Sequence, residues 1–239
     1  MLERTLEPEV MDSEEDAVEY NRMDHSAVNE TFVDEFLQFL GRHGKRLRLA
    51  EDPSFEDLDD IDVIGGLLDV GTGTALIPIE LCQRNPEVRV LAIDLAVSML
   101  DIAIHNVDAA GFRNQIQLAH IDAKDSDFED EMFDAVISNS IIHHIPEPAS
   151  VVSEMLRTTR EGGMIFVRDL MRPESSGEVD SLVETYAGQE SDYSRRLFGE
   201  SLHASLSLEE MRQLVASFDI DAATVTATSD RHWTWATVR

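Results

Sequence analysis

The segment Leu67–Cys82 constrains the fold of this chain most strongly. An apolar run that contains Asp69 is followed by the turn Gly71-Thr72-Gly73 and by a helix-forming stretch from Leu76. Strand, tight turn and helix in this order are typical of the first unit of a nucleotide-binding βαβ fold. Because glycine has no Cβ, the backbone of this turn can bend sharply and approach a ligand closely.

The residues of this turn limit which class of ligand it can bind. A dinucleotide fingerprint has a third glycine where this chain has Leu76, which disfavours a nicotinamide-dependent dehydrogenase. The carboxylate of Asp69 would repel a phosphate and attract an amine or a hydroxyl. The turn therefore predicts a nucleoside-like ligand with a cationic end.

Polar residues also end the strands that we expect further along the chain. Asp94 follows the apolar run Val88–Ile93, about twenty residues after the turn, where a carboxylate binds ribose hydroxyls. The alternative is that Asp94 caps the next helix. Asp122 and Asn139 end two later runs of the same kind. Ligands bind at the carboxyl ends of parallel strands, so we expect these side chains to share one pocket.

From Leu67 to Pro173, these segments resemble the class I S-adenosylmethionine-dependent methyltransferases, in particular a small-molecule, ubiquinone/menaquinone-biosynthesis-like branch. Leu68–Gly73 is similar to their first motif, Ile142–Pro148 to the segment after the fourth strand, and Leu156–Val167 to a helix, Gly-Gly and strand unit. The resemblance implies a methyltransferase that uses S-adenosyl-L-methionine and a small-molecule acceptor. The alternative is a non-catalytic cofactor-binding or partner-binding protein that retains the methyltransferase core.

The resemblance also implies which residues contact the cofactor. Met99 would cover the adenine, Asp122 would bind its amino group, and Tyr20 would bind the methionine carboxylate. Each also has a structural alternative, as a core residue, a solvated loop residue and a helix-packing residue respectively. The expected cofactor-binding residues are Tyr20, Asp69, Gly71, Thr72, Gly73, Asp94, Leu95, Met99, Asp122, Ala123 and Asn139.

No residue stands out as a catalytic base, and the candidates are His143, His144 and Asp169. A histidine with a pKa near neutrality can take a proton from an acceptor. We favour a structural or cofactor-proximal role for the two histidines. No metal is expected, because adjacent residues point apart on any regular element.

Alternating strands and helices predict a doubly wound α/β fold with a mostly parallel seven-stranded sheet. The runs Ala223–Ala227 and Trp233–Val238 resemble the closing hairpin of the family, which makes the last strand antiparallel. Residues 1–62 are expected to form a helical N-terminal extension and cofactor lid that ends in a solvated connector from Glu51. Residues 63–239 would form the S-adenosylmethionine-binding domain, with helices near 181–186 and 208–217 and a substrate-lid insertion at about 174–207.

The composition limits partners and location. The formal net charge is −29, and no stripe of Lys or Arg is present, so we expect no nucleic-acid partner. The single Cys82 excludes an internal disulfide, and no apolar run is long enough to span a membrane. The acidic start of the chain shows no leader peptide, so we expect a cytoplasmic protein. The oligomeric state stays open, with a homodimer as one option.

Overall fold

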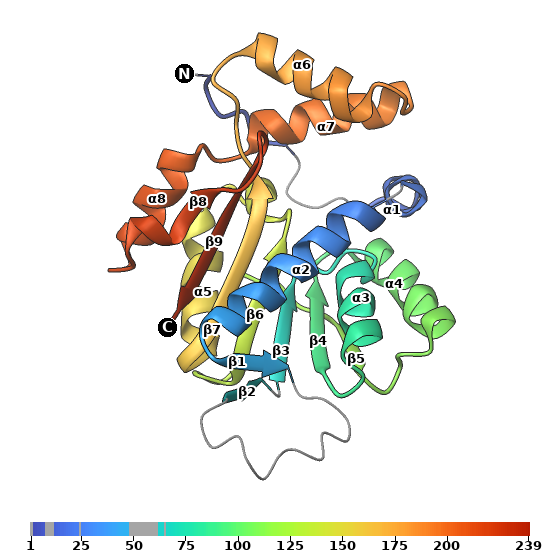
Figure 1. Ribbon diagram of the computed structural model, residues 1–239. Helices are drawn as coiled ribbons and strands as arrows, with labels where there is room; N and C mark the ends of the chain where they lie inside the picture. Colours follow the sequence, from blue (N-terminus) through green and yellow to red (C-terminus); the bar gives the residue numbers. More distant parts are fainter. Residues whose placement is uncertain (1, 8–11, 24, 48–61, 65) are drawn as a thin grey trace.

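The computed structural model describes residues 2–7, 12–23, 25–47, 62–64 and 66–239 (Figure 1). The connector expected from Glu51 to Asp62 lies outside the described residues except for Asp62. Among the described residues, no helix combines the length and the apolar character that crossing a membrane requires.

A seven-stranded sheet forms the centre of the molecule, in the order β5-β4-β3-β6-β7-β9-β8 (Figure 1). Strands β3 to β7 are parallel to one another, whereas β9 is antiparallel to both β7 and β8. The predicted sheet and its antiparallel closing hairpin are therefore confirmed. The strands are β3 (Gly66–Val70), β4 (Arg89–Asp94), β5 (Ile116–His120), β6 (Phe133–Asn139), β7 (Thr159–Leu170), β8 (Val225–Ala227) and β9 (His232–Val238).

Helices cover both faces of this sheet. On one face, α2 (Ser26–Arg42), α3 (Leu76–Arg84) and α4 (Val97–Ala110) contribute to one apolar cluster. On the other face, α5 (Pro148–Thr158) and α8 (Leu208–Ala216) contribute to a second cluster. Successive strand residues alternate between the two, as Leu67 and Leu68 do. This explains why the strands are continuous apolar runs, since both sides of each strand are buried.

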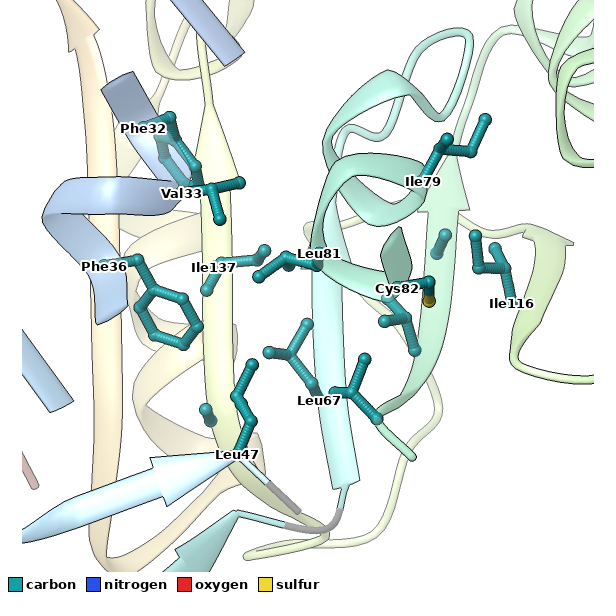
Figure 2. Close-up of a cluster of buried hydrophobic side chains, with 14 of the residues drawn as sticks. Phe32, Val33, Phe36, Leu47, Leu67, Ile79, Leu81, Cys82, Ile116 and Ile137 are labelled. Atoms are coloured by element: carbon teal, nitrogen blue, oxygen red, sulfur yellow. The ribbon is translucent and has the colours of Figure 1, made fainter. Parts of the chain in front are cut away.

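The helix α2 is an integral layer of the core. Its side chains Phe32, Phe36 and Phe39 surround Phe166 of β7, with ring centroids 5.2, 5.7 and 5.9 Å away. Figure 2 shows Phe32, Val33 and Phe36 facing Ile137 of β6. Helix α2, although it lies in the N-terminal extension, therefore packs directly on the central sheet.

The rest of the extension has two further parts. Helix α1 (Glu14–Arg22) packs on α4, where Ala17 and Tyr20 meet Ala96 and Met99. A short parallel pair, β1 (Lys45–Leu47) and β2 (Asp62–Ile64), was not predicted and crosses the expected domain boundary at residue 62.

The segment 174–207 folds into two helices beyond the end of β7 (Figure 1). The predicted helix near 181–186 is part of α6 (Ser176–Ala187), and the helix α7 (Asp192–Ala204) was not predicted. The two helices pack on Leu170 and on Leu2 of the N-terminal segment. Two short 3-10 turns, η2 (Ile142–His144) and η3 (Ala222–Thr224), complete the described elements.

Candidate functional site

The turn after β3 needs glycine at two positions for different reasons. Gly71 and Gly73 have φ angles of +73° and +55°, a region that disfavours other residues. A Cβ on Gly71 would lie 2.0 Å from Cγ2 of Ile141, so the chain that follows β6 fills this space. A Cβ on Gly73 would have only Tyr20 Cε1 within 4 Å, at 3.9 Å. The close neighbour of Gly71 is therefore the protein itself, through Ile141, whereas the space beside Gly73 is open to a ligand.

Asp69 is a buried carboxylate with no countercharge among the described residues. Its side chain lies on β3 next to the turn, the residue is 2% exposed, and no ion pair joins it to another described residue. Burial raises the pKa of Asp69 to about 7, although the Thr72 side chain opposes the shift and the charge of Asp94 adds to it. A carboxylate of this kind is stabilised by a ligand that brings positive charge.

Asp94 is the last residue of β4, and its side chain is hydrogen-bonded both to the turn after β3 and to the start of α4. Its Oδ2 accepts a hydrogen bond from the backbone N–H of Gly73 at 2.7 Å, and its Oδ1 accepts one from Ala96 at 2.8 Å. The N-cap of α4 is Ala96, with no side-chain capping bond, so the alternative that Asp94 is the N-cap is wrong. Because a carboxylate oxygen accepts more than one hydrogen bond, both oxygens can also accept from a ligand.

One cavity at the carboxyl ends of β3, β4 and β6 contains all the expected cofactor residues. It is lined by Tyr20, Asp69, Gly71, Thr72, Gly73, Asp94, Leu95, Met99, Asp122, Ala123 and Asn139. Asp69, Asp94, Asp122 and Asn139, which were expected to share a pocket because they lie at the ends of parallel strands, all line it. Their contacts with a cofactor stay a prediction.

Three residues of the cavity had structural alternatives. Burial, with the carboxylates of Asp94 and Asp69 close by, raises the pKa of Tyr20 to about 12, so Tyr20 is a neutral phenol in the cavity. Met99 lines the cavity and also packs in the small cluster under α1. Asp122 is half-exposed and pairs with Lys124 Nζ at 2.9 Å. Each residue thus combines a structural contact with a place in the cavity.

Sequence reasoning missed several lining residues. Asn29 reaches the cavity from α2, where its polar position resembles any solvent-facing residue of an amphipathic helix. Ala96 and Ile121 are apolar neighbours of predicted residues and carried no chemical signal. The missed lining residues are Asn29, Thr74, Leu76, Ile77, Ile93, Ala96, Ile121, Lys124, Ser140, Ile141 and Ile145. No residue of 174–207, all of which are described, lines the cavity.

Of the three catalytic candidates, His144 lines the cavity, whereas His143 and Asp169 are buried behind it. Asp169 Oδ1 lies 2.5 Å from His143 Nδ1, and its Oδ2 accepts hydrogen bonds from the backbone N–H of Ile142 and of His143. Burial lowers the pKa of His143, but the charges of Asp169 and Glu7 outweigh it and the net shift is upward. Asp169 therefore positions His143 and has no place in the cavity lining.

The expectation that adjacent histidines point apart is wrong for this pair. Both lie on the 3-10 turn η2, and their ring centroids are 4.2 Å apart with an interplanar angle of 34°. Successive side chains of a 3-10 helix, which has 3.0 residues per turn, point in different directions. Because η2 is only three residues long and Asp169 holds the His143 ring by a hydrogen bond, both rings can lie on the same side.

The N-terminal segment closes the region next to these histidines. The Arg4 guanidinium donates to the carbonyls of Ala204, Ile145 and His143 at 2.6, 3.0 and 3.1 Å. Leu2 O accepts a hydrogen bond from Arg172 Nε at 3.0 Å. Sequence reasoning missed this segment, because isolated charges without periodicity give no signal of burial.

Comparisons with known proteins agree with this geometry. Residues 68–167 match the family described as "Methyltransferase domain". A phosphatidylethanolamine N-methyltransferase of Cereibacter sphaeroides is 35% identical over 121 residues, which cover 50% of this chain and 58% of that protein. A demethylmenaquinone methyltransferase of Porphyromonas gingivalis is 29% identical over 162 residues, covering 63% and 66% respectively. The chain thus spans less than two thirds of the length of these relatives.

The fold has relatives among solved structures. A proposed S-adenosyl-L-methionine-dependent methyltransferase from Methanococcus maripaludis superposes with a TM-score of 0.66 at 16% identity, over 96% of this chain and 95% of that one. At this identity the likeness concerns the fold alone. S-adenosylmethionine is the cofactor of the methyltransferase family that the sequence motifs resemble. Residues 68–167 are thus similar to the methyltransferase domain, as the resemblance of their motifs to the class I S-adenosylmethionine-dependent methyltransferases implies.

Proposed function

We propose that this protein transfers the methyl group of S-adenosylmethionine to a small-molecule acceptor. The observation that carries the proposal is the convergence of Asp69 and Asp94, from adjoining strands, on one cavity. Motif and cavity agree at Asp69, Gly71 and Gly73, which belong to the motif that resembles the family and also line the cavity. The family match covers residues 68–167, and we propose methyl transfer as the activity of the whole protein.

The residues present fit the cofactor. The buried Asp69 carboxylate, which pairs with no cation among the described residues, would take the methionine ammonium group. The two oxygens of Asp94 would accept hydrogen bonds from the ribose hydroxyls while they hold the turn through Gly73. Met99 and Asp122 would contact the adenine, and the Tyr20 hydroxyl would bind the carboxylate.

The cofactor supplies a methyl group on a sulfonium sulfur, which is already activated toward a nucleophile. The chain then has to position the acceptor in line with that bond and exclude water. Well-oriented reactants reach effective molarities on the order of 10⁵–10⁸ M, so no strong base is needed. Ser140, Ile141 and His144 line the part of the cavity next to the turn after β6, where we place the acceptor.

Methyl transfer from labelled S-adenosylmethionine tests this proposal. The acceptor panel starts from the substrates that the relatives' names state, phosphatidylethanolamine and demethylmenaquinone, and adds small amines, thiols and phenols. We expect label in at least one acceptor, with loss of transfer in Asp94→Ala. Cofactor binding without transfer to any acceptor would favour the alternative of a non-catalytic cofactor-binding protein.

We infer three further properties from composition. With a net charge of −29, the acceptor is not a nucleic acid, because phosphate contacts need clustered cations. The one cysteine, Cys82, is buried and suits a reducing cytoplasm. A homodimer is the association to test first, by sedimentation, since cyclic dimers are the commonest oligomers.

A further inference from the structure

Three ligand-type side chains from distant parts of the chain meet beside the cofactor cavity. Glu7 comes from the N-terminal segment, and His143 and His144 come from η2. Glu7 Oε1 lies 3.4 Å from His143 Nε2 and 3.3 Å from His144 Nδ1, and all three ligand atoms lie within 4.8 Å of one another. The side chains of Glu7, His143 and His144 are only 7%, 4% and 18% exposed.

The distances fit a shared ion better than direct ion pairs. A charge-assisted N–H to carboxylate hydrogen bond is about 2.7–2.9 Å long, shorter than either contact. Glu7 Oε1 is buried and accepts no hydrogen bond from the described residues. Ligands about 2.0–2.2 Å from a tetrahedral metal ion lie roughly 3.3–3.6 Å apart, which matches both contacts.

The surroundings hold these side chains in place. Asp169 bonds to Nδ1 of His143 at 2.5 Å, which leaves Nε2, the nitrogen that faces Glu7, to act as a ligand. A carboxylate on the far nitrogen of a ligating histidine is a regular feature of metal sites. The second oxygen of Glu7 accepts a hydrogen bond from the Ser201 hydroxyl at 3.2 Å.

The donor set selects a class of metal. Two imidazole nitrogens and one carboxylate oxygen suit first-row transition ions, whereas Mg²⁺ and Ca²⁺ favour oxygen-only sites. Three protein ligands leave a fourth position open on a tetrahedral ion. His144 also lines the cavity, so the cluster borders it.

We propose that Glu7, His143 and His144 bind one divalent transition-metal ion, with Zn²⁺ the best match to the geometry. The three ligands lie outside the residues assigned to the cofactor, and His144 also lines the part of the cavity where we place the acceptor. It replaces the expectation of no metal, which depended on the histidines pointing apart. The ion would also tie the N-terminal segment to η2.

Metal titration of the full chain tests the proposal. Protein stripped with a chelator is titrated with Zn²⁺ by calorimetry, in about 0.3 M salt to screen weak binding to the acidic surface. We expect one tight site per chain in the wild type and in His105→Gln, which removes an exposed histidine of α4. Removal of an orienting carboxylate commonly lowers metal affinity roughly 10–100-fold, so Asp169→Asn should fall in that range. Glu7→Gln and His144→Gln each remove a direct ligand and should lose about 100-fold or more.

Two readouts separate a metal site from an ion-pair cluster. Bound Co²⁺ should give the strong visible absorption of a four-coordinate ion in the wild type and lose it in Glu7→Gln. Zn²⁺ should raise the melting temperature of the wild type and of His105→Gln but leave that of Glu7→Gln nearly unchanged. Melting curves recorded in chelator show that each variant is folded. Absence of a stoichiometric site in the wild type, or equal Zn²⁺ affinity in the wild type, Glu7→Gln and His144→Gln, would overturn the proposal, whatever the methyltransferase activity.

Discussion

At the scale of single residues, two carboxylates in one cavity differ in how the protein holds them. Asp94 accepts two backbone hydrogen bonds and is partly exposed, whereas Asp69 is buried without a described countercharge. Burial therefore makes the ionised form of Asp69 unfavourable in the free protein. Because Asp69 is buried, a cationic ligand would stabilise its ionised form more than that of an exposed carboxylate.

Asp69→Asn should change the pH dependence of stability. The folded pKa of about 7 lies above the ordinary aspartate pKa of 3.8, so the folded state binds more protons between these values and stability falls as pH rises toward 7. The Asn variant lacks this loss, which is on the order of 2–4 kcal/mol by pH 8. Melting temperatures of cofactor-free protein from pH 5 to pH 8 measure it, and Asp69→Asn should gain on the wild type as pH rises.

The exposed Asp101→Asn serves as the control for loss of one surface charge. A difference between Asp69→Asn and the wild type that stays constant over this range contradicts the assignment. Cofactor affinity should also be weaker in Asp69→Asn, because an amide cannot neutralise an ammonium group.

At the scale of elements, α2 belongs to the core although it lies in the predicted extension. Phe36→Ala should lower the free energy of unfolding by about 3–5 kcal/mol, because it leaves a cavity beside Phe166. Chemical denaturation measures the change, and Gln38→Ala on the exposed side of the same helix should stay within about 0.5 kcal/mol. A Phe36→Ala variant with normal stability but weakened cofactor binding would instead indicate that α2 is a detachable lid.

The sequence predicted elements well where periodicity and motif agreed. The strands and the residues at their ends could be placed because apolar runs, acids and glycines recur in a fixed order. Helix α7 was missed because its buried residues, Ser194, Leu202 and Ala204, form a weak apolar pattern. Its N-cap, Ser191, which accepts from the backbone N–H of Ser194, was the available signal. The β1 and β2 pair is three residues long on each strand and has no such signal.

At the scale of the whole molecule, contacts between distant segments could be predicted only where they follow from the parallel sheet or from the family resemblance. Arg4 and His143 are 139 residues apart, and no local pattern reports their contact. The pairing of β9 with β7 also joins separated parts of the chain, but it could be predicted because it follows from the family resemblance. The sequence alone therefore did not predict the side of the cavity where the N-terminal segment contacts η2.

The central claim is that the cavity binds S-adenosylmethionine through Asp94, and calorimetric titration of the cofactor tests it most directly. We expect one site per chain, weaker binding in Asp94→Asn, and a loss of about 10²-fold or more in Asp94→Ala, because charge-assisted bonds to two hydroxyls are removed. Melting curves of the cofactor-free variants show how much of the loss comes from the turn that Asp94 holds. No binding to the wild type at millimolar cofactor, or unchanged affinity in a folded Asp94→Ala, would contradict the claim.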